Sequence, residues 1–172
     1  MNANIEIKAR VQSPEHFAET ATKITRSKPE IIIQHDVFFH ATTGRLKLRM
    51  FPDGTGELIQ YSRPDQDGPK TSCYVLAPTD QPTQLREALG AALGEIGEVQ
   101  KCRQLWLSGR TRIHLDEVSG LGWFMELEVV MGDGDCSVEA TAEAEELKDR
   151  LGVVAADLVD RAYIDLLMET HA

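Results

Sequence analysis

The stretch "NIEIKAR", residues 4–10, alternates apolar and charged side chains. Because successive side chains of a β-strand point to opposite faces, Ile5 and its apolar neighbours would share one face, and Glu6 and Lys8 would share the other. An apolar face packs against a core, whereas a charged face points either to solvent or into a polar interior. The direction of this charged face therefore decides between an open sheet and a closed barrel.

Four further segments repeat this pairing of an apolar face with an ionic face. Their ionic faces carry Arg45, Lys47 and Arg49 in "GRLKLRM"; Lys101 and Arg103 in "KCRQ"; Arg110, Arg112, His114 and Asp116 in "RTRIHLDE"; and Glu126 and Glu128 in "FMELEVV". Three like charges on one strand contribute little to stability in water, since exposed ion pairs are weak and like charges repel. Inside a closed barrel the same cluster needs a compensating anion.

Two architectures fit this pattern. An open sheet with helices on its apolar face would leave the ions in water, whereas a closed barrel with helices outside would turn them towards a polar lumen. A lumen with many Arg and Lys residues and a few carboxylates suits a metal-bound polyphosphate. Guanidinium and ammonium groups bind phosphate oxygens, and carboxylates bind a hard divalent cation. The pattern alone leaves both architectures open.

The order of the predicted elements indicates an α+β domain with a largely antiparallel sheet or barrel. Strands are predicted at 4–10, 30–40, 44–51, 57–63, 70–77, 98–109, 110–118 and 123–131, and helices at 13–27, 82–93, 138–152 and 157–170. Ser13 and Pro14 are typical of a helix start, and Gly94 is typical of a helix end. We find no internal repeat and no linker, so a single domain over residues 1–172 is expected.

Charge and cysteine content restrict the classes of partner. The 172-residue chain has a formal net charge of -10, which argues against a general binder of nucleic acid or acidic membranes. Its three cysteines are odd in number and widely spaced, as is typical of a protein from a reducing compartment. No apolar run approaches the roughly 20 residues that span a bilayer. We therefore expect a cytoplasmic protein without a nucleic-acid or membrane partner.

Four segments together resemble a known family. They are "NIEIKARV", "GRLKLR", "ELIQYSRPDQDGPKTSCY" and "TRIHLDEVSGLGWFMELEVV". In this order and spacing they resemble the CYTH superfamily of triphosphate tunnel metalloenzymes, and in particular its class IV adenylyl cyclase-like branch. The resemblance implies a single CYTH-like domain with a closed eight-stranded antiparallel β-barrel and helices packed outside. It also implies a triphosphate bound inside the barrel with Mg2+ or Mn2+.

The resemblance assigns roles to the ionic faces. It implies as metal ligands Glu6, Asp116, Glu126 and Glu128, with Asp116 either near the metal or holding a basic neighbour. The implied substrate contacts are Lys8, Arg45, Lys47, Arg49, Arg103 and Arg112, and weaker phosphate contacts are Arg10, Arg63, Lys101 and Arg110. The implied catalytic group is Glu6, Lys8, Glu126 and Glu128. The E-x-E-x-K signature of the family falls on Asn4, Glu6 and Lys8, so its first acidic position is not met. Asn4 offers a carbonyl oxygen without charge and is expected to be a weak or indirect ligand, so the choice between one and two metal ions is left open. His114 on the same ionic face is either a phosphate donor or a structural residue.

These assignments lead to an expected activity with two alternatives. We expect a metal-dependent enzyme that hydrolyses an organic or inorganic triphosphate, with ATP, thiamine triphosphate and inorganic triphosphate as candidate substrates. The first alternative is a class IV adenylyl cyclase, which converts ATP to cyclic AMP and pyrophosphate. The second is a module that binds polyphosphate or nucleotide without turnover. The organic group of the substrate, the preferred metal, and the choice between monomer and homodimer are left open.

Overall fold

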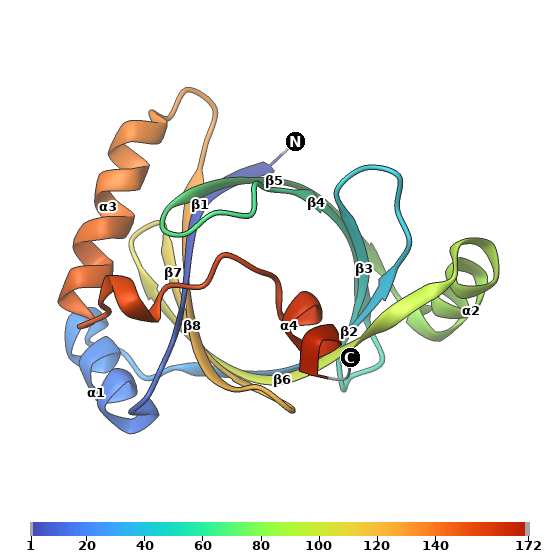
Figure 1. Cartoon of the computed structure of the whole chain (residues 1–172), viewed down its shortest axis with the longest axis horizontal. Coiled ribbons are helices and arrows are strands. Elements are labelled where there is room, and N and C mark those ends of the chain that lie inside the picture. Colours follow the sequence, from blue (N-terminus) through green and yellow to red (C-terminus); the bar gives the residue numbers. More distant parts are fainter. Residues whose placement is uncertain (1, 171–172) are drawn as a thin grey trace.

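A computed structural model describes residues 2–170, and its centre is a closed barrel of eight strands (Figure 1). The strands are β1 (Asn2–Arg10), β2 (Glu30–Phe39), β3 (Arg45–Met50), β4 (Gly56–Ser62), β5 (Lys70–Thr79), β6 (Glu95–Ser108), β7 (Thr111–Val118) and β8 (Gly122–Met131). Around the barrel they follow the order β1-β5-β4-β3-β2-β6-β7-β8, and every neighbouring pair is antiparallel. Pairing of β8 with β1 closes the sheet, so the predicted fold class is confirmed.

Three helices lie outside the barrel wall (Figure 1). They are α1 (Pro14–Thr25), α2 (Pro82–Leu93) and α3 (Ser137–Arg150). Helix α1 contacts β6 and β7, α3 contacts β1 and β8, and α2 contacts β2 and β3 on the opposite side. None of the helices within residues 2–170 is long and apolar enough to span a membrane.

The apolar faces of the strands point outward, towards these helices. In β1, Ile7 and Ala9 are fully buried in a cluster that includes Phe17 of α1 and the small residues Ala140 and Ala144 of α3. Small side chains let a helix approach the sheet closely, so the outer layer excludes water from the apolar face. The alternation of strand side chains then turns the ionic faces towards the barrel axis. The closed-barrel alternative is therefore the correct one.

Tight turns hold the neighbouring strands in register. Between β3 and β4, the amide of Thr55 donates to Asp53 Oδ1 at 2.9 Å, and Gly54 has a φ of 86°, which favours glycine. The resulting hairpin places Arg49 directly opposite Glu57, so that both side chains enter the barrel.

The C-terminal segment departs from the expected helix over 157–170. A short 3-10 helix covers Ala155–Asp157, residues 158–162 are not helical, and α4 begins only at Tyr163 and ends at Thr170. The non-helical conformation arises because the amide of Val159 donates to the Lys8 carbonyl at 2.9 Å, a contact with β1 that a helix would lose. As a result α4 does not join the outer layer, and it lies at one end of the barrel (Figure 1).

Candidate active site

The barrel encloses a cavity of about 330 Å³ that receives side chains from all eight strands. Its charged lining residues are Lys8, Lys47, Arg49, Arg63, Lys101, Arg103, Arg112, Glu6, Asp36, Glu57, Glu126 and Glu128. The seven cationic side chains outnumber the five carboxylates, although the whole chain has a net charge of -10. Positive charge is therefore concentrated inside the barrel, where a low dielectric strengthens its attraction for an anion.

Strands β1 and β8 contribute a charged ladder on their inward faces. Their register places Lys8 opposite Glu126 and Glu6 opposite Glu128. Lys8 Nζ lies 3.0 Å from Glu126 Oε1, and Arg103 Nη2 lies 2.6 Å from Glu126 Oε2. Burial opposes ionisation of Glu126, but the charges of Lys8 and Arg103 hold the pKa of this carboxyl well below its ordinary value. Glu126 is therefore anionic at neutral pH.

Glu6 has a different electrostatic environment from Glu126. Burial raises the pKa of Glu6, the Arg63 guanidinium 2.8 Å away opposes that rise, and the charges of Glu126 and Glu128 add to it. Three acidic groups thus share a region where their mutual repulsion is only partly compensated. A divalent cation placed among them would remove this repulsion, since it favours the charged form of each carboxylate.

A group of metal-binding residue types lies on the wall formed by β7 and β8. Ligand atoms of His114, Glu126 and Glu128 all lie within 4.8 Å of one another. Burial lowers the pKa of His114 to about 4, and the nearby charge of Arg103 acts in the same direction, so its imidazole is neutral at pH 7. Its Nδ1 atom is buried without a hydrogen-bond partner within residues 2–170, and so is Asn4 Oδ1. Oxygen and nitrogen donors without protein partners fit the divalent metal that the sequence predicts.

Asp116 does not line the cavity. It accepts two hydrogen bonds from Arg103, both at 2.7 Å, and one from the Tyr163 hydroxyl at 2.9 Å, and it is fully buried. Lys101 Nζ lies 3.7 Å from the same carboxylate. Of the two roles expected for Asp116, this geometry matches the holding of a basic neighbour.

Asp36 is a cavity residue that the sequence reasoning missed. It lies on β2, is 2 % exposed, and accepts hydrogen bonds from Lys47 at 2.8 Å and from Arg49 at 2.8 and 2.9 Å. Burial disfavours its charge, but Arg49 and Lys47 hold the pKa of Asp36 well below its ordinary value. The run of three isoleucines in "EIIIQHDVFF" conceals the alternation. The alternation can still be seen in Gln34, Asp36 and Phe38, which stand at every second position and therefore share one face of the strand.

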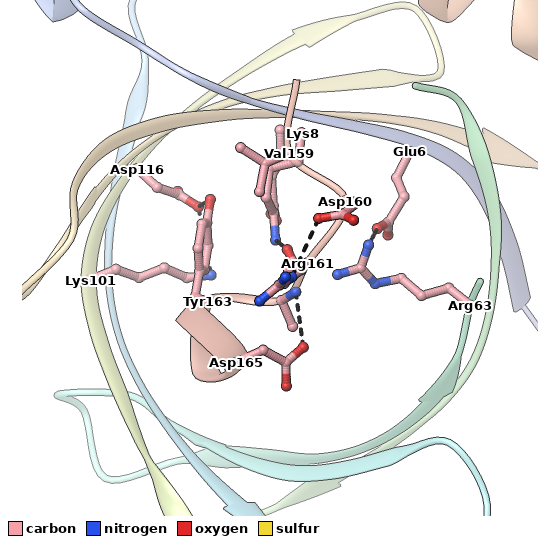
Figure 2. Close-up of polar contacts among 12 residues, drawn as sticks. Glu6, Lys8, Arg63, Lys101, Asp116, Val159, Asp160, Arg161, Tyr163 and Asp165 are labelled. Atoms are coloured by element: carbon pink, nitrogen blue, oxygen red, sulfur yellow. Dashed lines mark hydrogen bonds and ion pairs between the residues drawn. The ribbon is translucent and has the colours of Figure 1, made fainter. Parts of the chain in front are cut away.

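The C-terminal segment closes one end of the cavity. Lys8 Nζ donates to the Arg161 carbonyl at 3.1 Å, and Lys70 Nζ donates to the Asp160 carbonyl at 3.3 Å. Tyr163 lines the cavity, with Lys8 Nζ 3.9 Å from the centre of its ring. Figure 2 shows this segment inside the barrel, with Asp116 and Lys101 on one side and Glu6 and Arg63 on the other. Neither Lys70 nor Tyr163 was predicted as a site residue, because their importance depends on contacts between distant parts of the chain.

Three of the predicted phosphate contacts lie away from the cavity lining. Arg45 bonds to Asp165 of α4 at 2.7 Å and also contacts an exposed aspartate. Arg110 bonds to Glu143 of α3 at 2.8 Å, and Arg10 is exposed with its guanidinium 4.9 Å from the centre of a phenylalanine ring. The structure brings the other predicted basic residues together, namely Lys8, Lys47, Arg49, Arg63, Lys101, Arg103 and Arg112.

Comparison with known proteins agrees with this barrel fold. Residues 2–163 match the family described as CYTH domain. The chain belongs to the CYTH domain family. This match covers every strand of the barrel and ends at Tyr163, the first residue of α4. The resemblance seen in the four sequence segments is therefore confirmed.

Relatives of this CYTH protein carry adenylate cyclase names. "Putative adenylate cyclase MJ0240" of Methanocaldococcus jannaschii is 21 % identical, over 94 % of this chain and 97 % of that protein. A solved structure described as a "putative adenylate cyclase" from Vibrio parahaemolyticus is 19 % identical with a TM-score of 0.79, covering 96 % of this chain and 97 % of that one. The PH1012 protein of Pyrococcus horikoshii OT3 is 22 % identical with a TM-score of 0.79, covering 95 % and 98 %. At these identities, the structural likeness shows a shared fold.

Proposed function

We propose that this CYTH protein is a divalent-metal-dependent enzyme that hydrolyses an organic or inorganic triphosphate bound in the barrel. The observation that carries the proposal is the enclosed cavity, into which an acidic chain directs seven cationic side chains. Such a cluster is costly in a low dielectric unless an anion compensates it. A triphosphate is an anion of high charge whose oxygens match both Arg forks and Lys ammonium groups.

The basic residues would bind and orient the phosphate chain. Asp36 holds Arg49 through its Nε and Nη2 atoms, and Asp116 holds Arg103 through the same two atoms. Within residues 2–170 neither arginine uses its Nη1 group in a hydrogen bond, so each keeps donors for a phosphate oxygen. Because buried carboxylates already hold them, these arginines pay little conformational entropy when they bind substrate.

The acidic wall would hold the metal. Glu6, Glu126 and Glu128 would supply carboxylate oxygens, and the side-chain carbonyl oxygen of Asn4, at the first position of the same signature, has no hydrogen-bond partner among residues 2–170. A bound Mg2+ or Mn2+ would neutralise charge on the phosphate oxygens and favour attack by water. Lys8 lies beside Glu126 and would also contact a phosphate oxygen, while Tyr163 and its segment limit access of bulk water from one end.

A second candidate activity is conversion of ATP to cyclic AMP and pyrophosphate. The adenylate cyclase names of the relatives from Methanocaldococcus jannaschii and Vibrio parahaemolyticus favour it. The same phosphate and metal contacts would serve both reactions. They differ in the phosphorus that is attacked: the terminal phosphorus by water, or the α-phosphorus by the ribose 3'-hydroxyl. Binding without turnover is a third outcome and would make the protein a polyphosphate or nucleotide module.

One assay separates these outcomes. Purified protein is incubated with ATP, thiamine triphosphate or inorganic triphosphate, each with Mg2+ or Mn2+, and phosphate, pyrophosphate and cyclic AMP are resolved. Hydrolysis predicts phosphate release, with loss of at least about 100-fold in rate for Glu126→Gln because the metal loses a charged ligand. Arg86→Gln is the matched control, since Arg86 pairs with Glu95 on the outer surface. Cyclic AMP with equimolar pyrophosphate would support the cyclase, and absence of every product would contradict catalysis.

A further inference from the structure

His114 occupies an unusual position for a tunnel residue. It lies in β7 directly opposite Glu126 of β8, is 3 % exposed, and lines the cavity. The sequence suggested either a phosphate donor or a structural histidine. A structural histidine normally satisfies its buried nitrogen, but Nδ1 of His114 has no hydrogen-bond partner in the described part of the chain. The imidazole therefore has a buried polar atom that faces no protein partner within residues 2–170, as does Asn4 in the same cavity.

The surroundings of this imidazole favour a cation over a phosphate as its partner. Ligand atoms of His114, Glu126 and Glu128 lie within 4.8 Å of one another. Octahedral ligands of one ion lie about 3.1 Å apart when cis and about 4.4 Å apart when trans, for bonds of about 2.2 Å, so a bound ion would draw these three side chains together. Within residues 2–170 Glu128 has one ion pair, of 3.3 Å to the partly exposed Arg112, whereas Glu126 has two, so Glu128 is freer to bind a cation. A phosphate at the same point would face two negative side chains.

We propose that His114 is a nitrogen ligand of the tunnel metal, together with Glu126 and Glu128, and that this mixed donor set makes the site select Mn2+ over Mg2+. The inference rests on the proposed function, because the ion is the one that triphosphate hydrolysis requires. Mg2+ prefers an octahedral shell of oxygens and keeps its waters, whereas imidazole is a better ligand for first-row transition metals. An imidazole nitrogen in the ligand set therefore penalises Mg2+ relative to Mn2+.

Pulsed electron paramagnetic resonance tests the ligand directly. Protein without an affinity tag is loaded with one equivalent of Mn2+ in the absence of triphosphate, and electron spin echo envelope modulation from directly bound ¹⁴N is recorded. We expect ¹⁴N modulation in the wild type, and its replacement by the ¹⁵N pattern when all histidines are ¹⁵N-labelled. The labelled wild type needs no substitution, so the test stands even where a variant fails to fold.

Variants then assign the nitrogen to one residue. His114→Gln should lose the modulation and bind Mn2+ about tenfold or more weakly, with a smaller loss for Mg2+, as measured by calorimetric titration. His16→Gln is the matched control, because His16 is exposed on α1, outside the barrel. It should keep both the modulation and the affinity.

Two results would overturn the inference: Mn2+ that binds without ¹⁴N modulation, and a wild-type protein that binds no Mn2+ at this site. Phosphate release from a triphosphate added with excess Mn2+ is measured on the same protein preparations. If turnover persists while the modulation is absent, the proposed hydrolysis stands and the nitrogen ligand is wrong. If turnover is absent while the modulation is present, the metal site stands and the proposed hydrolysis is wrong.

Discussion

At the scale of single residues, buried carboxylates hold the cations of the cavity in place. Asp36 pairs with Lys47 and Arg49, and Asp116 pairs with Arg103. Each carboxylate is at most 2 % exposed, so its charge is stabilised almost entirely by these partners. The cations are thereby held at fixed positions in the cavity before any anion arrives.

Removal of the Asp36 charge should destabilise the protein strongly. Asp36→Asn leaves the buried cations Lys47 and Arg49 without their anion, and breaking a buried ion pair costs about 3–5 kcal/mol. Equilibrium unfolding in urea measures the free energy of unfolding. The control Asp65→Asn removes a half-exposed partner of Arg45 and should cost about 0–1 kcal/mol. Equal and small losses in the two variants would show that Asp36 does not organise the cations.

Lys101 should make triphosphate binding depend on pH. Burial, aided by the charge of Arg103, lowers the pKa of Lys101 to about 7. In the free protein, Lys101 loses its proton as the pH rises through 7. A bound anion stabilises the protonated ammonium form. Binding above pH 7 is therefore accompanied by uptake of a proton. Affinity should therefore fall between pH 7 and 9, by up to about tenfold per pH unit.

Calorimetric titrations in two buffers of different ionisation enthalpy measure this proton uptake at pH 8. Lys101→Met should remove most of it, because the variant has no amine at this position. An uptake that is zero in the wild type, or unchanged in Lys101→Met, would contradict the assignment to Lys101.

At the scale of elements, alternation, residue composition and turn signals predicted the strands well and the C-terminal segment poorly. The ionic faces of residues 4–10 and 123–131 could be predicted because alternation of apolar and charged residues is a local property of the chain. Residues 158–162 have helix-compatible composition, but pairing with the end of β1 is worth more to them than a helical turn. That competition depends on contacts more than 140 residues apart, as between Val159 and Lys8, and no local pattern reports it.

Tyr163 should anchor this segment to the barrel. Tyr163→Phe removes the hydrogen bond to Asp116 but keeps the ring against Phe124, so we expect a loss of about 1.5–3 kcal/mol, as for a bond to a charged group. Tyr163→Ala also removes the ring and should cost about 3–5 kcal/mol. Urea unfolding gives both values, and hydrogen exchange should show faster exchange in α4. Wild-type stability of Tyr163→Ala would contradict an anchoring role.

At the scale of the whole molecule, the barrel separates two interiors. The outer layer, between the wall and the three helices α1, α2 and α3, is apolar, whereas the inner cavity holds the ionic side chains together with some apolar ones. The sequence could predict the two faces, the closed fold through its resemblance to the CYTH superfamily, and all seven Lys and Arg residues of the cavity lining. It could not predict which charges pair. Asp116 and Arg45 lie on the same strand faces as the cavity residues, yet they contact α4. Alternation along a strand decides which face a side chain occupies, whereas its position along the barrel axis decides which residues it contacts.

Binding of a non-hydrolysable triphosphate analogue with Mg2+, followed by isothermal titration calorimetry, tests the central claim most directly. The account predicts one site per chain, and Arg112→Gln should weaken binding by about 10- to 150-fold, the loss of a charge-assisted hydrogen bond of about 1.5–3 kcal/mol. Arg112 lines the cavity and is partly exposed, so its replacement should leave the fold intact. The outer-surface control Arg86→Gln should bind like the wild type. No saturable binding to the wild type, or the same affinity in Arg112→Gln, would contradict the claim that the barrel is a triphosphate site.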